Sequence, residues 1–189
     1  MSIRYRILLI VLPLLITSLI IAQVATSLAA RNGITSIATE FLRFKNEQLV
    51  TYARNQWSVL EDNGLSDQRS YIEYAQTAVE SFARSLTRNE TEVIFAVDSD
   101  AQVTMATSEF ELSEPERDTV LSIVARNTDG WHGLTVGGRE RVAWVGYFEP
   151  FDWYVFVTEQ RATFYRAVNQ MRYQTVIVIA IASVVSIVL

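Results

Sequence analysis

The sequence contains no cysteine, one histidine (His132) and one lysine (Lys45) among its 189 residues. Without cysteine the chain forms no disulfide, performs no thiolate catalysis and binds no zinc through sulfur. A single histidine offers little basis for a Ser-His-Asp set or a histidine metal site. We therefore predict no catalytic residue, no metal site and no cofactor, and we do not expect this segment to be an enzyme.

Basic residues are outnumbered by acidic ones in the part of the chain between the two uncharged segments. Residues 31–174 hold 14 basic and 21 acidic residues, a net charge of −7, and every acidic residue lies between Glu40 and Glu159. A nucleic-acid backbone is bound by clustered cations. We therefore exclude nucleic acid as the main partner.

Two segments lack charge altogether, and the first is Ile7 to Ala30, with 24 residues. As a helix it would extend about 36 Å, against about 30 Å for a bilayer core. Arg4 and Arg6 precede it and favour a cytoplasmic N-terminus. We interpret residues 1–30 as a cytoplasmic start and a first transmembrane helix. A cleaved signal peptide is the alternative.

The second uncharged segment is Thr175 to Leu189, with 15 apolar or small residues. It would extend only about 22 Å as a helix, so residues 175–189 are interpreted as a truncated second transmembrane helix. We therefore expect the native protein to continue into the cytoplasm. A buried C-terminal strand or helix is the alternative. The predicted topology is multi-pass in the inner (plasma) membrane, with residues 31–174 extracytoplasmic, an arrangement that suits a sensor.

The first part of this predicted domain, residues 31–88, has helical periodicity. Gly33 to Leu60 is expected to form a rod with the preceding segment, since no proline lies between Thr17 and Leu60. Its narrow apolar stripe predicts contact with the same helix of a second subunit, as in a homodimer, or packing on its own domain. Asp62-Asn63-Gly64 ends this helix, and Ser66 or Asp67 is expected to cap the next one, 68–88.

The periodicity changes to that of strands over residues 91–158. Strands are predicted at 91–96, 102–107, 131–136, 139–148 and 153–158, with a helix at 114–126 capped by Ser113. Gly137-Gly138 suits a tight hairpin turn, and residues 159–174 form a predicted exit helix. The fold class is thus α+β: long N-terminal helices and a five-stranded antiparallel PAS-like sheet with helices on one side, flanked by two transmembrane helices.

The segment Arg31–Arg172 resembles the single Cache domain, the extracytoplasmic PAS-like sensor of bacterial transmembrane receptors. The resemblance rests on the long leading helix, the hairpin VIFAVDSDAQVTMATS and the closing segment WVGYFEPFDWYVFVTEQRATFY. Ala101 and Asp152 depart from it, because glycine is more usual at both positions. The resemblance implies a receptor that binds a small solute.

The output module implied by this resemblance would be cytoplasmic. Such modules include methyl-accepting chemotaxis domains, histidine kinases, nucleotide cyclases and diguanylate cyclases. The alternative function is a membrane-tethered dimerisation or protein-interaction module that has no small-molecule ligand.

Strand alternation suggests where a ligand would bind. It places Arg141, Ala143, Val145 and Tyr147 on one face, with two small residues between a guanidinium group and a phenol. A carboxylate or another small polar solute would suit that arrangement. In the alternative, Arg141 is solvated and Tyr147 covers a filled core. Asp98 and Asp100 lack the rest of a calcium loop and are interpreted as turn residues. The predicted ligand-binding residues are Arg141, Tyr147, Trp131, His132 and Tyr74.

Overall fold

The computed structural model describes residues 3–126, 129–166, 170, 173 and 177. The chain divides into two compact units, one of Met1–Ile37 with Tyr165–Leu189 and the other of Ala38–Phe164. The second unit contains the sheet. The predicted span 175–189 lies outside the described residues except for Ile177, as do most side chains of the first predicted span. Within the part of the chain that is described, no helix combines the length and apolar character needed to cross a membrane.

Two helices precede the sheet. Helix α1 (Ile3–Asp62) is continuous, as the absence of proline after Thr17 predicted, and it ends beside Gly64, whose φ is +65°. Helix α2 (Arg69–Leu86) follows, but the predicted cap by Ser66 or Asp67 is wrong. Gln68 occupies the capping position and makes no side-chain hydrogen bond there.

Five antiparallel strands form one sheet in the order β2-β1-β5-β4-β3. The predicted α+β class and PAS-like strand order are confirmed. The first hairpin pairs β1 with β2, and the second pairs β3 with β4, so that β5 lies in the centre between β1 and β4. The strand bounds are Glu92–Val97 (β1), Val103–Ala106 (β2), Gly130–Val136 (β3), Arg139–Phe148 (β4) and Trp153–Gln160 (β5).

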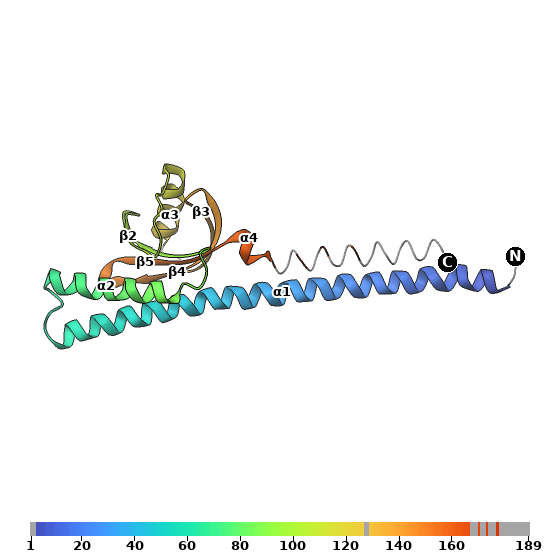
Figure 1. Ribbon diagram of the computed structural model, residues 1–189, viewed down its shortest axis with the longest axis horizontal. Helices are drawn as coiled ribbons and strands as arrows, with labels where there is room; N and C mark the ends of the chain where they lie inside the picture. The colour runs from blue at the N-terminus through green and yellow to red at the C-terminus, as the bar shows by residue number, and fades with distance from the viewer. Residues whose placement is uncertain (1–2, 127–128, 167–169, 171–172, 174–176, 178–189) are drawn as a thin grey trace. The chain divides into compact units, whose positions relative to one another are not determined.

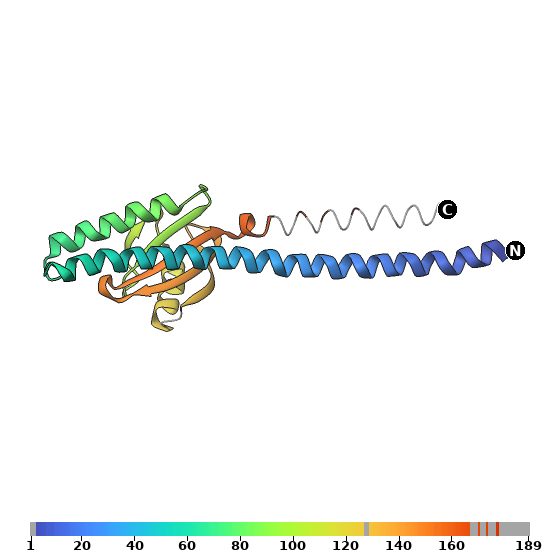
Figure 2. The same cartoon turned by 90° about the horizontal axis from the view of Figure 1, so that it is seen from below.

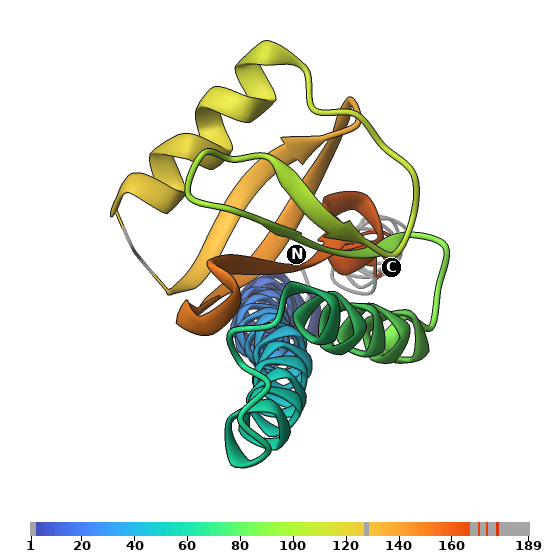
Figure 3. The same ribbon diagram turned by 90° about the vertical axis from the view of Figure 1, so that its left-hand side faces the viewer.

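Helices cover both faces of this sheet. Helices α1 and α2 lie on one face, and α3 (Glu114–Arg126) lies on the other (Figures 1, 2 and 3). The expectation of helices on one side is therefore wrong. The physical reason lies in β1 and β5, which are apolar at successive positions and buried along nearly their whole length. Strands of this composition must be covered from both sides.

The face under α3 carries the main apolar core. Phe95 of β1 and Phe156 of β5 stack there with ring centroids 4.7 Å apart. Val120 and Val124 of α3 pack against the same cluster, which Ala143 and Val145 of β4 complete from below. Apolar side chains therefore occupy the space above the two small residues of β4.

The closing segment leads from the sheet towards the C-terminus. A 3-10 turn, η1 (Glu149–Phe151), precedes β5, and a short helix, α4 (Arg161–Phe164), follows it. Strand β5 runs two residues further than predicted, to Gln160, so the helix begins at Arg161 and not at residue 159. The later part of the predicted exit helix, 159–174, falls mostly outside the described residues.

Candidate functional site

The predicted face of β4 exists, but its two polar ends are far apart. Arg141, Ala143, Val145 and Tyr147 do face α3, and the middle two belong to the apolar core. Six residues of strand separate Arg141 from Tyr147, about 20 Å at 3.3 Å per residue. One small solute cannot contact both side chains, so each end must be considered separately.

Arg141 lies at the end of the sheet that leads into α4, and its side chain is buried, with 6% exposed. Its Nη1 donates to the carbonyl oxygen of Thr91 at 2.9 Å and to Oγ1 of Thr158 at 3.2 Å. Both acceptors are neutral. Among the described residues no carboxylate forms an ion pair with Arg141, and none accepts a hydrogen bond from its Nε.

The electrostatics of Arg141 agree with this geometry. Burial lowers the pKa of its guanidinium group; the negative charge of Glu159 opposes this shift and the positive charge of Arg139 adds to it. Glu159 belongs to the opposite face, because it alternates with Thr158 and Gln160 along β5. Arg141 is therefore a buried cation whose direct contacts are all uncharged.

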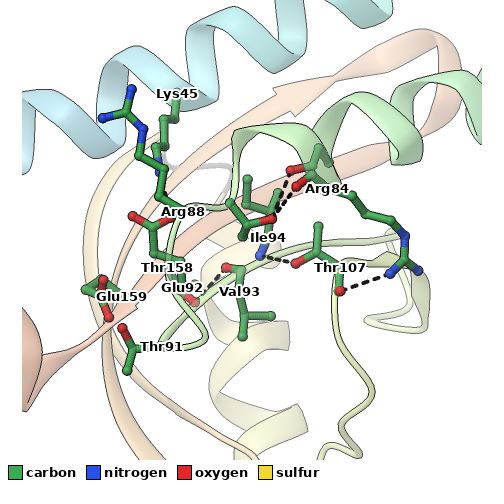
Figure 4. Close-up of polar contacts among 12 residues, drawn as sticks. Lys45, Arg84, Arg88, Thr91, Glu92, Val93, Ile94, Thr107, Thr158 and Glu159 are labelled. Carbon is green, nitrogen blue, oxygen red and sulfur yellow. Dashed lines mark hydrogen bonds and ion pairs between the residues drawn. The ribbon is translucent and has the colours of Figure 1, made fainter.

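Two more polar side chains next to Arg141 have unused donors. Gln160 pairs directly with Arg141 across β4 and β5, and Thr91 supplies the carbonyl that Arg141 contacts. Neither Nε2 of Gln160 nor Oγ1 of Thr91 has a partner among the described residues, although both atoms are buried. Figure 4 shows Thr91 and Thr158 at this end of the sheet. We did not predict any of these three neighbours from the sequence, because Thr91 comes just before β1 and Thr158 and Gln160 come from β5.

The Tyr147 end is a paired structural cluster. The Tyr147 hydroxyl donates to Oδ1 of Asp152 at 3.2 Å, and Ser99 donates to the same carboxylate through its hydroxyl at 2.6 Å and its backbone N–H at 3.1 Å. The hydrogen bond from the Ser99 side chain is the main cause that lowers the pKa of Asp152. Burial, followed by the bond to Asp152, raises the pKa of Tyr147. These contacts join the β1–β2 turn to the turn before β5.

The other predicted residues do not gather around Arg141. Trp131 lies on the opposite face of the sheet, where its ring packs against Phe164 of α4 at 5.2 Å. His132 shares the α3 face but lies opposite Ala143. Tyr74 is 74% exposed on α2, a helix of the other face. The structure thus places Arg141 beside Thr91, Thr158 and Gln160 and not beside Trp131, Tyr147 or Tyr74.

The opposite face of the same sheet end holds a second buried cation. Nζ of Lys45 donates to Oε2 of Glu92 at 2.7 Å, and both side chains are at least nine-tenths buried. The backbone N–H of Arg88 donates to the same oxygen at 2.7 Å. Lys45 and Arg88 also lie over the ring of Phe41, at 4.7 and 5.4 Å from its centroid (Figure 4 labels Lys45, Arg88 and Glu92). Here Lys45 and Glu92 are matched within the chain, while Glu159, also buried on this face, accepts a hydrogen bond from the backbone N–H of Gln160.

Within the described ranges there is no group of three or more His, Cys, Asp or Glu side chains that could hold a metal ion.

No protein-family model matches the sequence. No curated protein matches it either. Similarity is found among solved structures.

One solved structure, described as a periplasmic sensor domain of a chemotaxis protein, matches with a TM-score of 0.52 and 12% identity, covering 67% of this chain and 96% of that one. A methyl-accepting chemotaxis protein from Vibrio parahaemolyticus matches at 0.41 and 11%, covering 70% and 99%. A Cache chemosensory domain, titled for carboxylic acid recognition, matches at 0.41 and 14%, covering 63% and 95%. The first match shows that this chain has the fold of a periplasmic sensor domain, which is the fold that the Cache resemblance implies.

Proposed function

We propose that residues 31–174 are the extracytoplasmic ligand-sensing region of a transmembrane receptor in the inner (plasma) membrane. The region binds a small solute and passes a conformational change through the second predicted membrane helix to a cytoplasmic output domain. The sensor-domain fold supports this function at the level of architecture. The observation that carries it is Arg141, a buried cation without a carboxylate partner on a sheet face of that fold.

A buried charge without a charged partner is costly to retain for stability alone. Removing an ion from water costs several kcal/mol in a folded protein unless charges or hydrogen bonds offset that loss. Arg141 receives two neutral acceptors on one nitrogen and none on Nε. A side chain of this kind is explained if a solute supplies the missing acceptor when it binds.

The test is a thermal-shift screen of the full chain in mild detergent against a broad library of small metabolites. We expect one chemical class to raise the melting temperature by several degrees, because a ligand that binds only the folded state stabilises it. Arg141→Met should abolish this shift and remain folded. Arg139→Met is the matched control, because Arg139 lies on the same strand face but is exposed. No shift with any solute would contradict the proposed function.

A second candidate function, the dimerisation module, is favoured by the outer face of α1. Phe41 and Phe44 are 37% and 53% exposed, and Gln48, Thr51 and Asn55 continue the same face at steps of three and four residues. None of these side chains is charged. A heptad seam without charge suits the same helix of a second copy of the chain. The inner face, by contrast, packs on its own domain through Leu42, Leu49 and Ala53.

Cysteine cross-linking tests this second function cleanly, because the chain has no native cysteine. In membranes under mild oxidation, we expect Gln48→Cys to give a covalent dimer and Arg54→Cys, on another side of the helix, to give little. Equal cross-linking of the two variants would contradict a parallel dimer along this face. A dimer in a chain that binds no solute would favour the interaction module over the sensor.

A further inference from the structure

We infer that the end of the sheet where β1, β4 and β5 meet binds a small oxyanion through Arg141, Gln160 and Thr91, and that the bound anion acts on α4. This inference rests on the proposed function, for which it specifies the site, the ligand class and the first step of signalling.

The unused hydrogen-bonding atoms at this site are donors. Nε of Arg141 and Nε2 of Gln160 can only donate, and the hydroxyl of Thr91 can do so. Gln160 is the cross-strand partner of Arg141, and the backbone carbonyl of Thr91 accepts a hydrogen bond from Nη1 of Arg141, so the three residues are neighbours. A ligand that matches three donors must present several acceptors within a small volume, which is the chemistry of an oxyanion.

The charges around the site point to the same class of ligand. Glu159 faces the other side of the sheet, opposite Glu92, and Glu92 is already paired with Lys45. On the α3 face, the guanidinium of Arg141 therefore has no negative group in contact with it among the described residues. A guanidinium binds carboxylate and similar planar oxyanions through parallel hydrogen bonds. Nη1 of Arg141 makes its two hydrogen bonds within the chain, whereas its buried Nε has no acceptor among the described residues.

The position of Gln160 connects this site to the exit segment. Gln160 is the last residue of β5 and is only half-buried, and Arg161 begins α4 directly after it. Outside the site, Arg161 pairs with Glu140 at 3.2 Å, and these side chains are 60% and 71% exposed. Exposed ion pairs contribute little to stability. An anion that draws the Gln160 amide towards Arg141 therefore shifts the start of α4 against weak resistance.

A natural probe of that movement is Trp131 of β3, which contacts α4. The Phe164 ring packs against Trp131 with centroids 5.2 Å apart. A shift of α4 changes the surroundings of this indole and hence its fluorescence. Trp131 thus reports on ligand binding without contacting the ligand.

The experiment uses the full chain in detergent, titrated separately with sodium acetate, propionate, nitrate, sulfate and phosphate against sodium chloride at equal ionic strength. We expect at least one oxyanion to raise the melting temperature and to change the tryptophan emission, and Trp131→Phe should remove most of that change. Acetate or propionate would identify a carboxylate source, and the other salts an inorganic one. Thr91→Val and Gln160→Met should each weaken binding about tenfold, the effect of one hydrogen bond to a charged group. Thr135→Val, on β3 outside the site, should leave it unchanged.

The outcomes separate the inference from the proposed function. If an oxyanion binds equally well to both site variants, or if no oxyanion binds while the metabolite screen finds a neutral or cationic solute, the inference is overturned and the sensor function stands. An oxyanion that stabilises the chain without changing the Trp131 signal overturns the coupling to α4. If no solute binds, the proposed function fails as well.

Discussion

Each face of the sheet has a buried cation at the same end of the sheet, but the two cations have different hydrogen-bond partners. Under α1 and α2, Lys45 has its carboxylate, Glu92, at 2.7 Å. Under α3, Arg141 has only a carbonyl and a hydroxyl oxygen. Both side chains are similarly buried, at 4% and 6% exposed. Lys45 is thus paired with a carboxylate of the same chain, and Arg141 is the buried cation for which we propose a ligand.

Removing Lys45 from its ion pair should lower the free energy of unfolding more than any other change predicted here. Lys45→Met leaves Glu92 buried opposite Glu159 with a single backbone donor, so we expect the free energy of unfolding to fall by about 3–5 kcal/mol. Arg141→Met should cost only about 1 kcal/mol, because the two hydrogen bonds that are lost are largely offset by no longer burying an unpaired charge, and no carboxylate loses its partner. Denaturant unfolding of the full chain in detergent measures both.

The double variant Lys45→Met/Glu92→Leu is the control for this comparison. It should recover most of the stability lost in Lys45→Met, since replacing a whole buried ion pair with apolar residues is often neutral. If Arg141→Met destabilises the protein as much as Lys45→Met, Arg141 is a structural residue and the contrast between the faces is wrong.

A second way to test the paired face uses the contact between α1 and β4. Asn46 of α1 donates from Nδ2 to the carbonyl oxygen of Val155 at 2.8 Å. Its Oδ1 lies where a side chain at Gly146 would begin, 2.3 Å from an added Cβ. Gly146→Ala must therefore displace Asn46 and break its bond. We expect a loss of about 2–4 kcal/mol from overpacking and the lost hydrogen bond.

The matched control is Gly133→Ala, on the neighbouring strand β3, where an added Cβ meets no atom within 4 Å. It should change the free energy of unfolding by less than about 0.5 kcal/mol. Equal losses in the two variants would mean that strand glycines matter for their backbone freedom, and not for the approach of Asn46.

Local chemistry made much of the fold predictable from the sequence. Gly137 and Gly138 adopt the positive φ angles, 59° and 70°, that a tight hairpin turn requires. The two residues that depart from the Cache pattern, Ala101 and Asp152, have φ angles of 55° and 52°, a conformation that glycine adopts without steric cost. In each case a short segment determines its own backbone conformation.

The candidate site was less predictable because its contacts join distant segments. Arg141 was predicted as a ligand residue from strand alternation alone. Its contact with Thr91 spans 50 residues, and the pair of Lys45 with Glu92 spans 47. Such pairs depend on the register of β5 between β1 and β4, which packing of the whole sheet determines. The same register placed Trp131 on the face opposite Arg141.

The α3 face also holds a buried carboxylate, Glu116, whose two oxygens both accept hydrogen bonds. One carboxylate oxygen accepts from the backbone N–H of Gly138 at 2.9 Å, and the other accepts from the N–H and hydroxyl of Ser113, each at 2.9 Å. Burial alone would raise the pKa of Glu116, but these hydrogen bonds outweigh it and hold the pKa below the ordinary value of 4.5. The contacts fix the start of α3 to the β3–β4 turn.

Because the pKa of Glu116 is lowered by folding, its contribution to stability is present above about pH 4.5. It is lost as the pH falls through the folded-state value. At pH 6, Glu116→Gln should cost about 1–2 kcal/mol, since an amide cannot accept bonds on both sides. The gap between wild type and variant should narrow by pH 3, as measured by denaturant unfolding at each pH. A gap that is constant with pH would show that the carboxylate charge is not what these donors stabilise. Arg141 would then no longer be the exceptional buried ion on this face.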